Sequence, residues 1–204
     1  MKEKLSTKDL CFTAIFAAVT AICAQIAIPL PFSPVPISFG MVGLYVAAIL
    51  LPPRCAIMSQ ACYLLLGAVG VPVFGGFRGG IGALFGPTGG YLLVYPIMAA
   101  IVSFALNSNR ALQIKRPQGR VLINGAISIC VAHLVLYIGG TVWLCATTGN
   151  TFMAGLSLAV FPYIPLDIVK IVFCIFAVIP LRKRFMNAGL LPMTFTALKE
   201  EGTE

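Results

Sequence analysis

The stretch FPYIPLDIVKIVFCIFAVIP, residues 161–180, is apolar throughout except for Asp167 and Lys170. A run of about 20 apolar residues is long enough to cross a lipid bilayer as a helix. Ionisable side chains inside such a segment are costly, and they usually mark a functional site. Any account of the fold and function therefore has to explain this pair of charges.

The composition of the whole chain is that of an integral membrane protein. Of its 204 residues, 59% are hydrophobic and 10% are charged, whereas about 25% of the residues in a typical soluble domain are charged. The mean hydropathy is +0.99. The seven cysteines show no C-x-x-C spacing, which indicates small buried side chains and neither a disulfide framework nor a metal site.

Six apolar segments alternate with breaks that contain proline, glycine or charge. An isolated segment in lipid must satisfy its own backbone hydrogen bonds, so each segment is predicted to be a helix. We expect an all-α membrane protein with one six-helix transmembrane domain, residues 1–184, and a cytoplasmic C-terminal tail, residues 185–204. The predicted helices cover residues 10–28, 38–51, 55–70, 89–106, 121–146 and 152–181.

The lysines and arginines predict the orientation. If the six helices alternate in direction, twelve of the fourteen basic residues fall on one side of the membrane, and an excess of basic residues marks the cytoplasmic side. Both termini are therefore predicted to be cytoplasmic, and the net charge of +8 requires no nucleic-acid partner. The twelve are Lys2, Lys4, Lys8, Arg54, Arg110, Lys115, Arg116, Arg120, Arg182, Lys183, Arg184 and Lys199.

The last apolar segment is too long for one straight span, because 30 residues would reach about 45 Å across a core of about 30 Å. Pro162 and Pro165 predict a break, followed by a span from about residue 166 to residue 181. Asp167 then lies in the first turn, with Lys170 on the same face near the outer surface. The pair is either a structural ion pair or part of a site for an anionic substrate, and the two alternatives can coexist.

The segment VPVFGGFRGGIGALFGPTGGY, residues 71–91, contains eight of the twenty glycines. Non-helical backbone at membrane depth is tolerated where it lines a cavity or is buried in protein. Its aromatic residues favour a packed loop over a flexible linker, so we predict a structured loop on the outer face between the third and fourth helices. No GK[ST] follows these glycines, and the chain is expected to have no nucleotide site of its own.

Several polar residues lie within predicted helices. Gln60 and Tyr63 in the third helix are expected to face the bundle interior. His133 is the only histidine, and we expect a hydrogen-bonded interior residue there, with Tyr137 one turn further along. In the first helix, small-xxx-small pairs allow close approach of another helix, by default within the same bundle; they are Ala14/Ala18 and Ala17/Ala21.

Four motifs resemble, in order and spacing, those of the BioY family, the biotin-specific S components of energy-coupling factor (ECF) transporters. They are PLPFSPVPIS (29–38), SQACYLLLGAVGVPVF (59–74), GPTGGYL (86–92) and PLDIVK (165–170). The resemblance covers about residues 10–184. It implies a six-helix bundle that captures biotin at the outer face of a bacterial cytoplasmic membrane. Transport would be driven by partners, a transmembrane coupling protein and two cytoplasmic subunits that hydrolyse ATP.

The resemblance also implies roles for particular residues. The family's ligand-contacting Asp and Lys correspond to Asp167 and Lys170, and its docking face on the first helix corresponds best to Ala14 and Ala18. The chain departs from the usual pattern at Gly40, where a glutamine is frequent, and at Ser38, where threonine is usual; Arg78 has no firm equivalent. The candidate substrate-binding residues are Asp167, Lys170, Arg78, Gln60, Tyr91 and Thr88, and the candidate partner-binding residues are Ala14, Ala18, Ala17 and Ala21, with no catalytic residue, cofactor or metal expected.

The chemistry of these residues suits biotin. Its carboxylate needs a cation, its ureido ring needs an acceptor and a donor, and its thiophane ring and valeryl chain need apolar walls. The sequence leaves open which polar residue meets which end of the vitamin. A pocket that leaves hydrogen-bonding groups unpaired with a wrong ligand rejects it strongly.

Three other functions are weaker readings of the sequence. An ion-coupled secondary transporter of another small organic anion or vitamin, acting alone, would need a relay of acidic groups, but one carboxylate lies at membrane depth. A membrane enzyme would need clustered Asp, Glu or His for acid/base or metal chemistry. A purely structural subunit would leave the charges at the outer face unexplained.

Overall fold

The computed structural model describes residues 6–31, 33–107 and 118–188. Predictions that rest on other residues lie outside this described part of the chain. They concern the cytoplasmic placement of Lys2, Lys4, Arg110, Lys115, Arg116 and Lys199, and the predicted tail from residue 189 onward.

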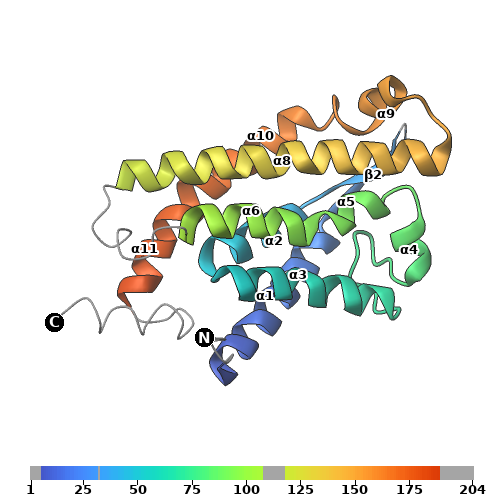
Figure 1. Ribbon diagram of the computed structural model, residues 1–204. Helices are drawn as coiled ribbons and strands as arrows, with labels where there is room; N and C mark the ends of the chain where they lie inside the picture. Colours follow the sequence, from blue (N-terminus) through green and yellow to red (C-terminus); the bar gives the residue numbers. More distant parts are fainter. Residues whose placement is uncertain (1–5, 32, 108–117, 189–204) are drawn as a thin grey trace.

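Helices make up most of the described residues, as predicted. Helix α8 lies across one side of a group formed by α1, α2, α3 and α6, and α6 packs between α8 and α3 (Figure 1). The helices are α1 (Thr7–Gln25), α2 (Gly40–Leu50), α3 (Pro53–Ala68), α4 (Ile81–Phe85), α5 (Gly89–Leu93), α6 (Tyr95–Asn107), α8 (Gln118–Thr148), α9 (Phe152–Ala159), α10 (Ile164–Phe173) and α11 (Ile179–Asn187).

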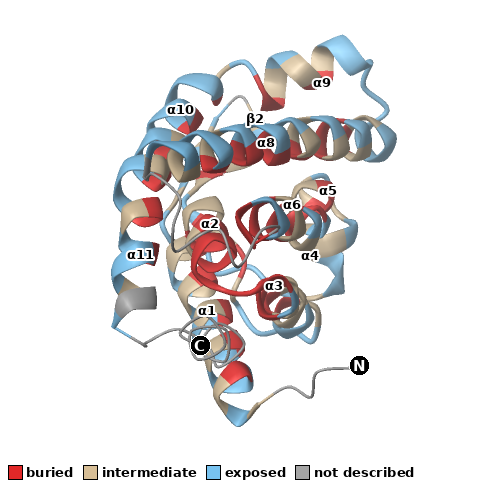
Figure 2. Ribbon diagram, turned by 60° about the vertical axis from the view of Figure 1, so that its left-hand side comes forward, coloured by how far each residue is buried: buried red, intermediate tan, exposed pale blue. Residues whose placement is uncertain are grey.

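Helix α2 forms the centre of the core. It packs against α1, α3 and α6, and Figure 2 shows it almost entirely in the colour of buried residues. Leu44, Tyr45 and Ile49 have no exposed surface. A helix that is buried on all sides is apolar all round, which explains why the sequence GMVGLYVAAIL has no polar face.

Within the described part of the chain, four helical segments are long and apolar enough to span a bilayer: Thr7–Gln25, Gly89–Asn107, Gly119–Thr148 and Ile164–Phe185. The second and third predicted spans correspond to α2 and α3, which are shorter, with 11 and 16 residues. The structure thus agrees with a mostly helical, multi-pass membrane protein. The outward side of α8 suits contact with lipid, since it exposes Ile123, Ile127, Leu134, Ile138 and Val142.

The prediction of an all-α fold is wrong between the first two helices. There, β1 (Ala27–Leu30) and β2 (Ser33–Ser38) form an antiparallel hairpin in which Ala27 pairs with Ser38 and Ile28 with Ile37. The physical reason is the density of proline, which cannot donate a helical hydrogen bond and whose fixed φ suits extended backbone. The prolines of this segment are Pro29, Pro31, Pro34 and Pro36.

The predicted break in the last segment is confirmed. Residues 160–163 form a turn between α9 and α10, and Pro165 lies in the first turn of α10, where a missing N–H costs least. A division that the sequence analysis did not predict follows: the π-helical turn η1 (Cys174–Val178) separates α10 from α11.

The glycine-rich loop is structured, as predicted. Phe74 and Arg78 exchange two backbone hydrogen bonds of 2.9 and 3.2 Å, and the loop then continues into α4 and α5. The ring of Phe74 is 2% exposed and packs so closely on Gly67 that a Cβ atom there would overlap it. In Figure 1, α4, α5 and α9 gather at one end of α8, and α11 lies toward the other end.

Candidate functional site

A cavity opens between β2, the glycine-rich loop, α3, α6, α8 and α10. Including the open solvent at its mouth, the empty space measures about 790 Å³. Its walls are mainly apolar and aromatic, with a few polar groups from β2, α8 and α10. This combination is typical of a pocket that orients a small ligand.

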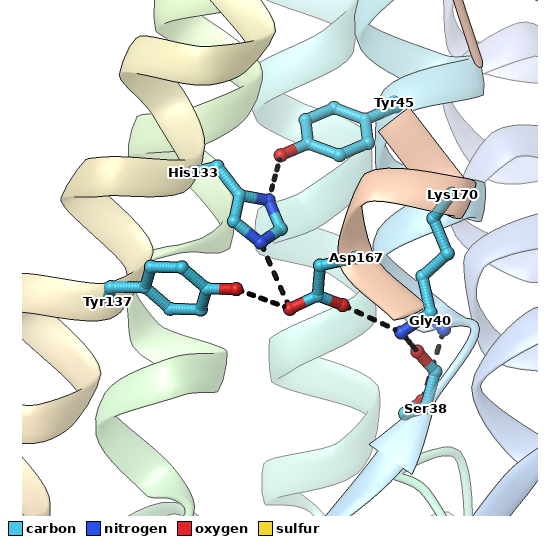
Figure 3. Close-up of polar contacts among 7 residues, drawn as sticks. All are labelled: Ser38, Gly40, Tyr45, His133, Tyr137, Asp167 and Lys170. Carbon is cyan, nitrogen blue, oxygen red and sulfur yellow. Dashed lines mark hydrogen bonds and ion pairs between the residues drawn. The ribbon is translucent and has the colours of Figure 1, made fainter. Parts of the chain in front are cut away.

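Asp167 and Lys170 form a buried ion pair in the wall of this cavity. The Lys170 Nζ lies 3.0 Å from the Asp167 Oδ1 (Figure 3), and the two residues are 4% and 2% exposed. Asp167 occupies the first turn of α10, where the helix dipole favours a carboxylate. The prediction that Asp167 lies in the first turn of the helix, with Lys170 on the same face, is confirmed, and the structure adds that the pair borders a cavity.

The second carboxylate oxygen of Asp167 is bonded to α8. The Tyr137 hydroxyl donates to Oδ2 over 2.7 Å, and the His133 Nε2 lies 3.1 Å from the same oxygen. The His133 Nδ1 lies 2.9 Å from the Tyr45 hydroxyl on α2. Because an ionised carboxylate can only accept, the His133 Nε2–H donates to Asp167. His133 is therefore a hydrogen-bonded interior residue, as expected.

Lys170 also bonds the hairpin. Its Nζ donates to the Ser38 carbonyl over 3.0 Å and lies 5.5 Å from the centre of the Phe39 ring. An ammonium has three N–H donors, so the bonds to Ser38 and Asp167 leave one for a ligand. The side chains of Asp167 and Lys170 thus connect α10 to α8 and to the hairpin.

Gly40, where the sequence departs from the pattern of the resembling family, has close neighbours on three sides. A Cβ atom there would lie 3.2 Å from the Ala24 Cβ, 3.2 Å from the Tyr95 hydroxyl and 3.3 Å from the Ser38 Oγ. The backbone N–H of Gly40 donates to that Ser38 Oγ over 3.1 Å. The wall at this point is therefore formed by Ser38 and Tyr95.

Tyrosines surround the site, and only one of them, Tyr91, was predicted from the sequence to contact the ligand. The chain has six tyrosines. One, Tyr45, holds His133, and the others line the cavity: Tyr63, Tyr91, Tyr95, Tyr137 and Tyr163. The position of these tyrosines in apolar segments could have indicated a polar site. A tyrosine ring suits an apolar wall, but its hydroxyl requires a hydrogen-bond partner.

Two of these tyrosines hold elements of the wall together. The Tyr163 hydroxyl donates to the Val35 carbonyl and lies 2.9 Å from the Ser33 Oγ, which ties the hairpin to the start of α10. The Tyr91 hydroxyl lies 3.2 Å from the Thr141 Oγ1 and links α5 to α8.

Five of the six predicted substrate-binding residues line the cavity: Asp167, Lys170, Arg78, Tyr91 and Thr88. The prediction for Gln60 is corrected by the structure. Gln60 is fully buried, but its Nε2 donates to the Thr20 Oγ1 and the Ser59 Oγ over 3.2 and 3.1 Å. These bonds hold its side chain between α3 and α1, and it is not part of the cavity wall, although Tyr63, three residues further along α3, is.

Arg78 lies at the rim. It is exposed, and its Nε donates to the Gly75 carbonyl over 3.2 Å. That bond leaves the terminal nitrogens of the guanidinium available in the fork geometry that suits a carboxylate.

The predicted docking alanines divide between two faces of α1. Ala14 and Ala18 are exposed, Ala21 is half-buried, and Ala17 is 2% exposed. Ala17 therefore packs inside the bundle, and its prediction as a partner-binding residue is corrected. The small residues Ala14 and Ala18 lie on the open face.

Known proteins of similar sequence belong to the family that the motifs resemble. The BioY family matches residues 1–187. The "Probable biotin transporter BioY" of Pyrococcus horikoshii is 34% identical over 166 residues, which cover 81% of this chain and 91% of that protein. The "Biotin transporter BioY2" of Lactococcus lactis subsp. cremoris is 36% identical over 162 residues, which cover 79% of this chain and 83% of that protein.

A solved structure shows the same fold. The crystal structure of the S-component for biotin from an ECF-type ABC transporter matches with a TM-score of 0.74 and 28% sequence identity. The match covers 88% of this chain and 95% of that one. Because the family match extends over almost the entire length, the chain belongs to the BioY family.

Proposed function

We propose that this chain captures biotin as the substrate-specific component of an ECF-type transporter in a bacterial cytoplasmic membrane. The observation that carries the proposal is the buried Asp167–Lys170 pair in the wall of a largely aromatic cavity. The similar proteins named as biotin transporters support it, as does the similar structure of an S-component for biotin.

The hydrogen-bonding capacity of the pair fits the ureido ring. A carboxylate accepts about four hydrogen bonds, and Asp167 already receives three, from Lys170, His133 and Tyr137. One acceptor position on Asp167 and one N–H of Lys170 remain. The ureido group presents an N–H next to a carbonyl oxygen, so one edge of the ring matches these two positions.

The ligand carboxylate belongs at the rim in this arrangement. If the ligand carboxylate lay beside Asp167, two negative charges would be close together in a buried site, and their repulsion would be unfavourable. Arg78 at the rim offers a cation that is exposed to solvent. Between the two ends, Phe74, Tyr95 and Leu136 provide apolar walls for the thiophane ring and the valeryl chain.

The proposed topology has six transmembrane helices, cytoplasmic termini and a cavity that faces outward. Arg120 lies in the first turn of α8, and Lys183 lies on α11. Both elements are at the end of the molecule away from the glycine-rich loop (Figure 1). An excess of basic residues favours the cytoplasmic side. The glycine-rich loop and the hairpin then lie on the outer side, where the substrate arrives.

The proposed partners supply the energy. A transmembrane coupling protein would dock on the face of α1 that carries Ala14 and Ala18, and two cytoplasmic ATPase subunits would bind and hydrolyse ATP. Leu10, Ile15 and Ile22 are 49%, 54% and 69% exposed beside these alanines. Small residues flanked by large apolar ones allow close helix packing in lipid. In this proposal the chain is a transport subunit and not an enzyme.

Binding of tritium-labelled biotin to the chain purified in detergent, without nucleotide or partner subunits, tests the proposed function. We expect saturable binding that unlabelled biotin displaces and that lipoic acid, which has the valeryl chain and carboxylate but no ureido ring, does not displace. Failure of the folded protein to bind biotin would contradict the proposal.

A further inference from the structure

Tyr63 has a buried hydroxyl without a hydrogen-bond partner among the described residues. The residue is 1% exposed and belongs to the wall of the cavity, yet no donor or acceptor of the described chain lies within bonding distance of its hydroxyl. Buried polar groups in proteins are nearly always paired, and an unpaired one destabilises the fold. This hydroxyl therefore needs an explanation.

Four other tyrosines of the site differ in this respect. The hydroxyls of Tyr45, Tyr91, Tyr137 and Tyr163 each bond to a protein group. These hydroxyls join neighbouring elements to one another. Tyr63 makes no such link to the described residues through its hydroxyl.

The ring of Tyr63 is held in place on two sides. It stacks on Tyr95 at 6.0 Å between centroids and 16° between planes, and it meets the edge of Phe74 at 5.5 Å and 79°. Phe74 in turn fills the space that Gly67 leaves open. Both geometries are favoured for aromatic pairs, so the hydroxyl is fixed in position before any ligand arrives.

We propose that the Tyr63 hydroxyl is a specificity-determining contact that hydrogen-bonds a polar atom of the bound ligand. This inference rests on the proposed function, since it assumes that biotin occupies the cavity. A phenol can donate or accept, and a fixed, buried hydroxyl is satisfied only by a ligand that places a polar atom against it. Apolar molecules of similar size leave it unpaired and are rejected.

The substitution Tyr63→Phe separates this role from a structural one. It keeps the ring with both aromatic contacts and removes the hydroxyl alone. Affinity for biotin is expected to fall about 5- to 100-fold, because the ligand's polar atom then becomes the unpaired group. The melting temperature of the ligand-free protein is expected to stay the same or to rise, because an unpaired buried group has been removed.

The matched control is Tyr163→Phe, the same chemical change in the same wall. The Tyr163 hydroxyl has two protein partners on the hairpin. Its loss is expected to lower the melting temperature of the ligand-free protein. Only Tyr163→Phe should therefore destabilise the empty protein.

Calorimetric titration of biotin into the full-length wild type and both variants, together with melting curves without ligand, decides the question. Wild-type affinity in Tyr63→Phe overturns the Tyr63 contact and leaves the proposed function intact. A fall in the melting temperature of Tyr63→Phe like that of Tyr163→Phe overturns it as well, because the hydroxyl then supports the fold. Absence of biotin binding by the folded wild type overturns the proposed function and this inference with it.

Discussion

The ammonium of Lys170 lies 3.0 Å from the Oδ1 of Asp167, one helical turn away, and both side chains are almost completely buried. A buried ion pair is a poor stabiliser, because the loss of hydration offsets much of the attraction between the charges. The pair stands at the wall of a cavity and each member keeps one hydrogen-bonding position unused. Binding of a polar ligand explains this arrangement better than stability does.

Gln25, at the C-terminal end of α1, connects this helix to the glycine-rich loop. Its Nε2 donates to the Pro72 and Val73 carbonyls over 3.3 and 3.0 Å, and its Oε1 accepts from the Phe77 N–H over 2.9 Å. Phe77 has a φ of +57°, a conformation that non-glycine residues adopt only when their surroundings hold them. One amide side chain thus fixes the loop that forms part of the cavity wall.

We expect Gln25→Ala to loosen residues 72–78. The amide protons of this loop should exchange with solvent at least about tenfold faster, since opening then breaks fewer bonds. Biotin should also dissociate faster. Hydrogen exchange followed by mass spectrometry checks the first expectation.

Asn150→Ala is the matched control for Gln25→Ala. Asn150 is an exposed amide whose Nδ2 donates to the nearby Thr148 Oγ1, far from residues 72–78 in the sequence. Exchange in residues 72–78 should be unchanged in this variant. Equal exchange rates in wild type and Gln25→Ala would show that Gln25 does not hold the loop.

Gly67 is predicted to be essential for the packing of the loop against α3. A Cβ atom at this position would overlap the Phe74 ring, and overpacking of a core usually costs about 1–3 kcal/mol. Gly67→Ala should lower the melting temperature and weaken biotin binding, because Phe74 supports Tyr63.

Gly82→Ala is the corresponding control. Gly82 lies in α4, and a Cβ atom there would have no neighbour within 4 Å. The melting temperature should be unchanged or slightly higher, because alanine favours helix over glycine. If both alanine variants melt at the same temperature, the close contact between Gly67 and Phe74 is refuted.

The open face of α1 is predicted to be needed for transport and not for binding. Leucine in place of Ala14 and Ala18 fills the shallow face between exposed apolar residues and should prevent close approach of another helix. Biotin affinity of the purified double variant should match wild type, whereas uptake by cells that express the whole transporter should be lost.

The control for this face is Leu134→Trp on the exposed side of α8. Leu134 is 59% exposed on a surface suited to lipid, so a larger side chain should leave uptake unchanged. Normal uptake by the Ala14→Leu/Ala18→Leu variant would exclude α1 as the docking face. Uptake by cells that lack the coupling protein and ATPases would favour the alternative of a carrier that acts alone.

Charge was the most informative feature of the sequence. In a chain so poor in ionisable side chains, Asp167 and Lys170 could be assigned to a site because lipid makes unpaired charges very costly. The break before α10 could likewise be predicted, because Pro162 and Pro165 restrict the backbone through their own covalent structure.

Features that depend on partners far along the chain could not be predicted. Gln60 and Tyr63 are almost one turn apart on α3, yet only Tyr63 lines the cavity, and an apolar helix without a polar face does not indicate which side faces which neighbour. The hairpin was missed for a similar reason. Its prolines exclude a helix, but only the pairing of Ala27 with Ser38 shows that the chain folds back as strands.

Titration of biotin into purified Asp167→Asn protein, beside wild type, tests the central claim most directly. The change preserves shape but removes the charge, and loss of a charge-assisted hydrogen bond, about 1.5–3 kcal/mol, should raise the Kd about 10- to 150-fold. The double variant Asp167→Asn/Lys170→Met, which leaves no charge unpaired, should keep the fold and also lose affinity. Folded variants that bind biotin with the wild-type Kd would contradict the assignment of this pair as the ligand site.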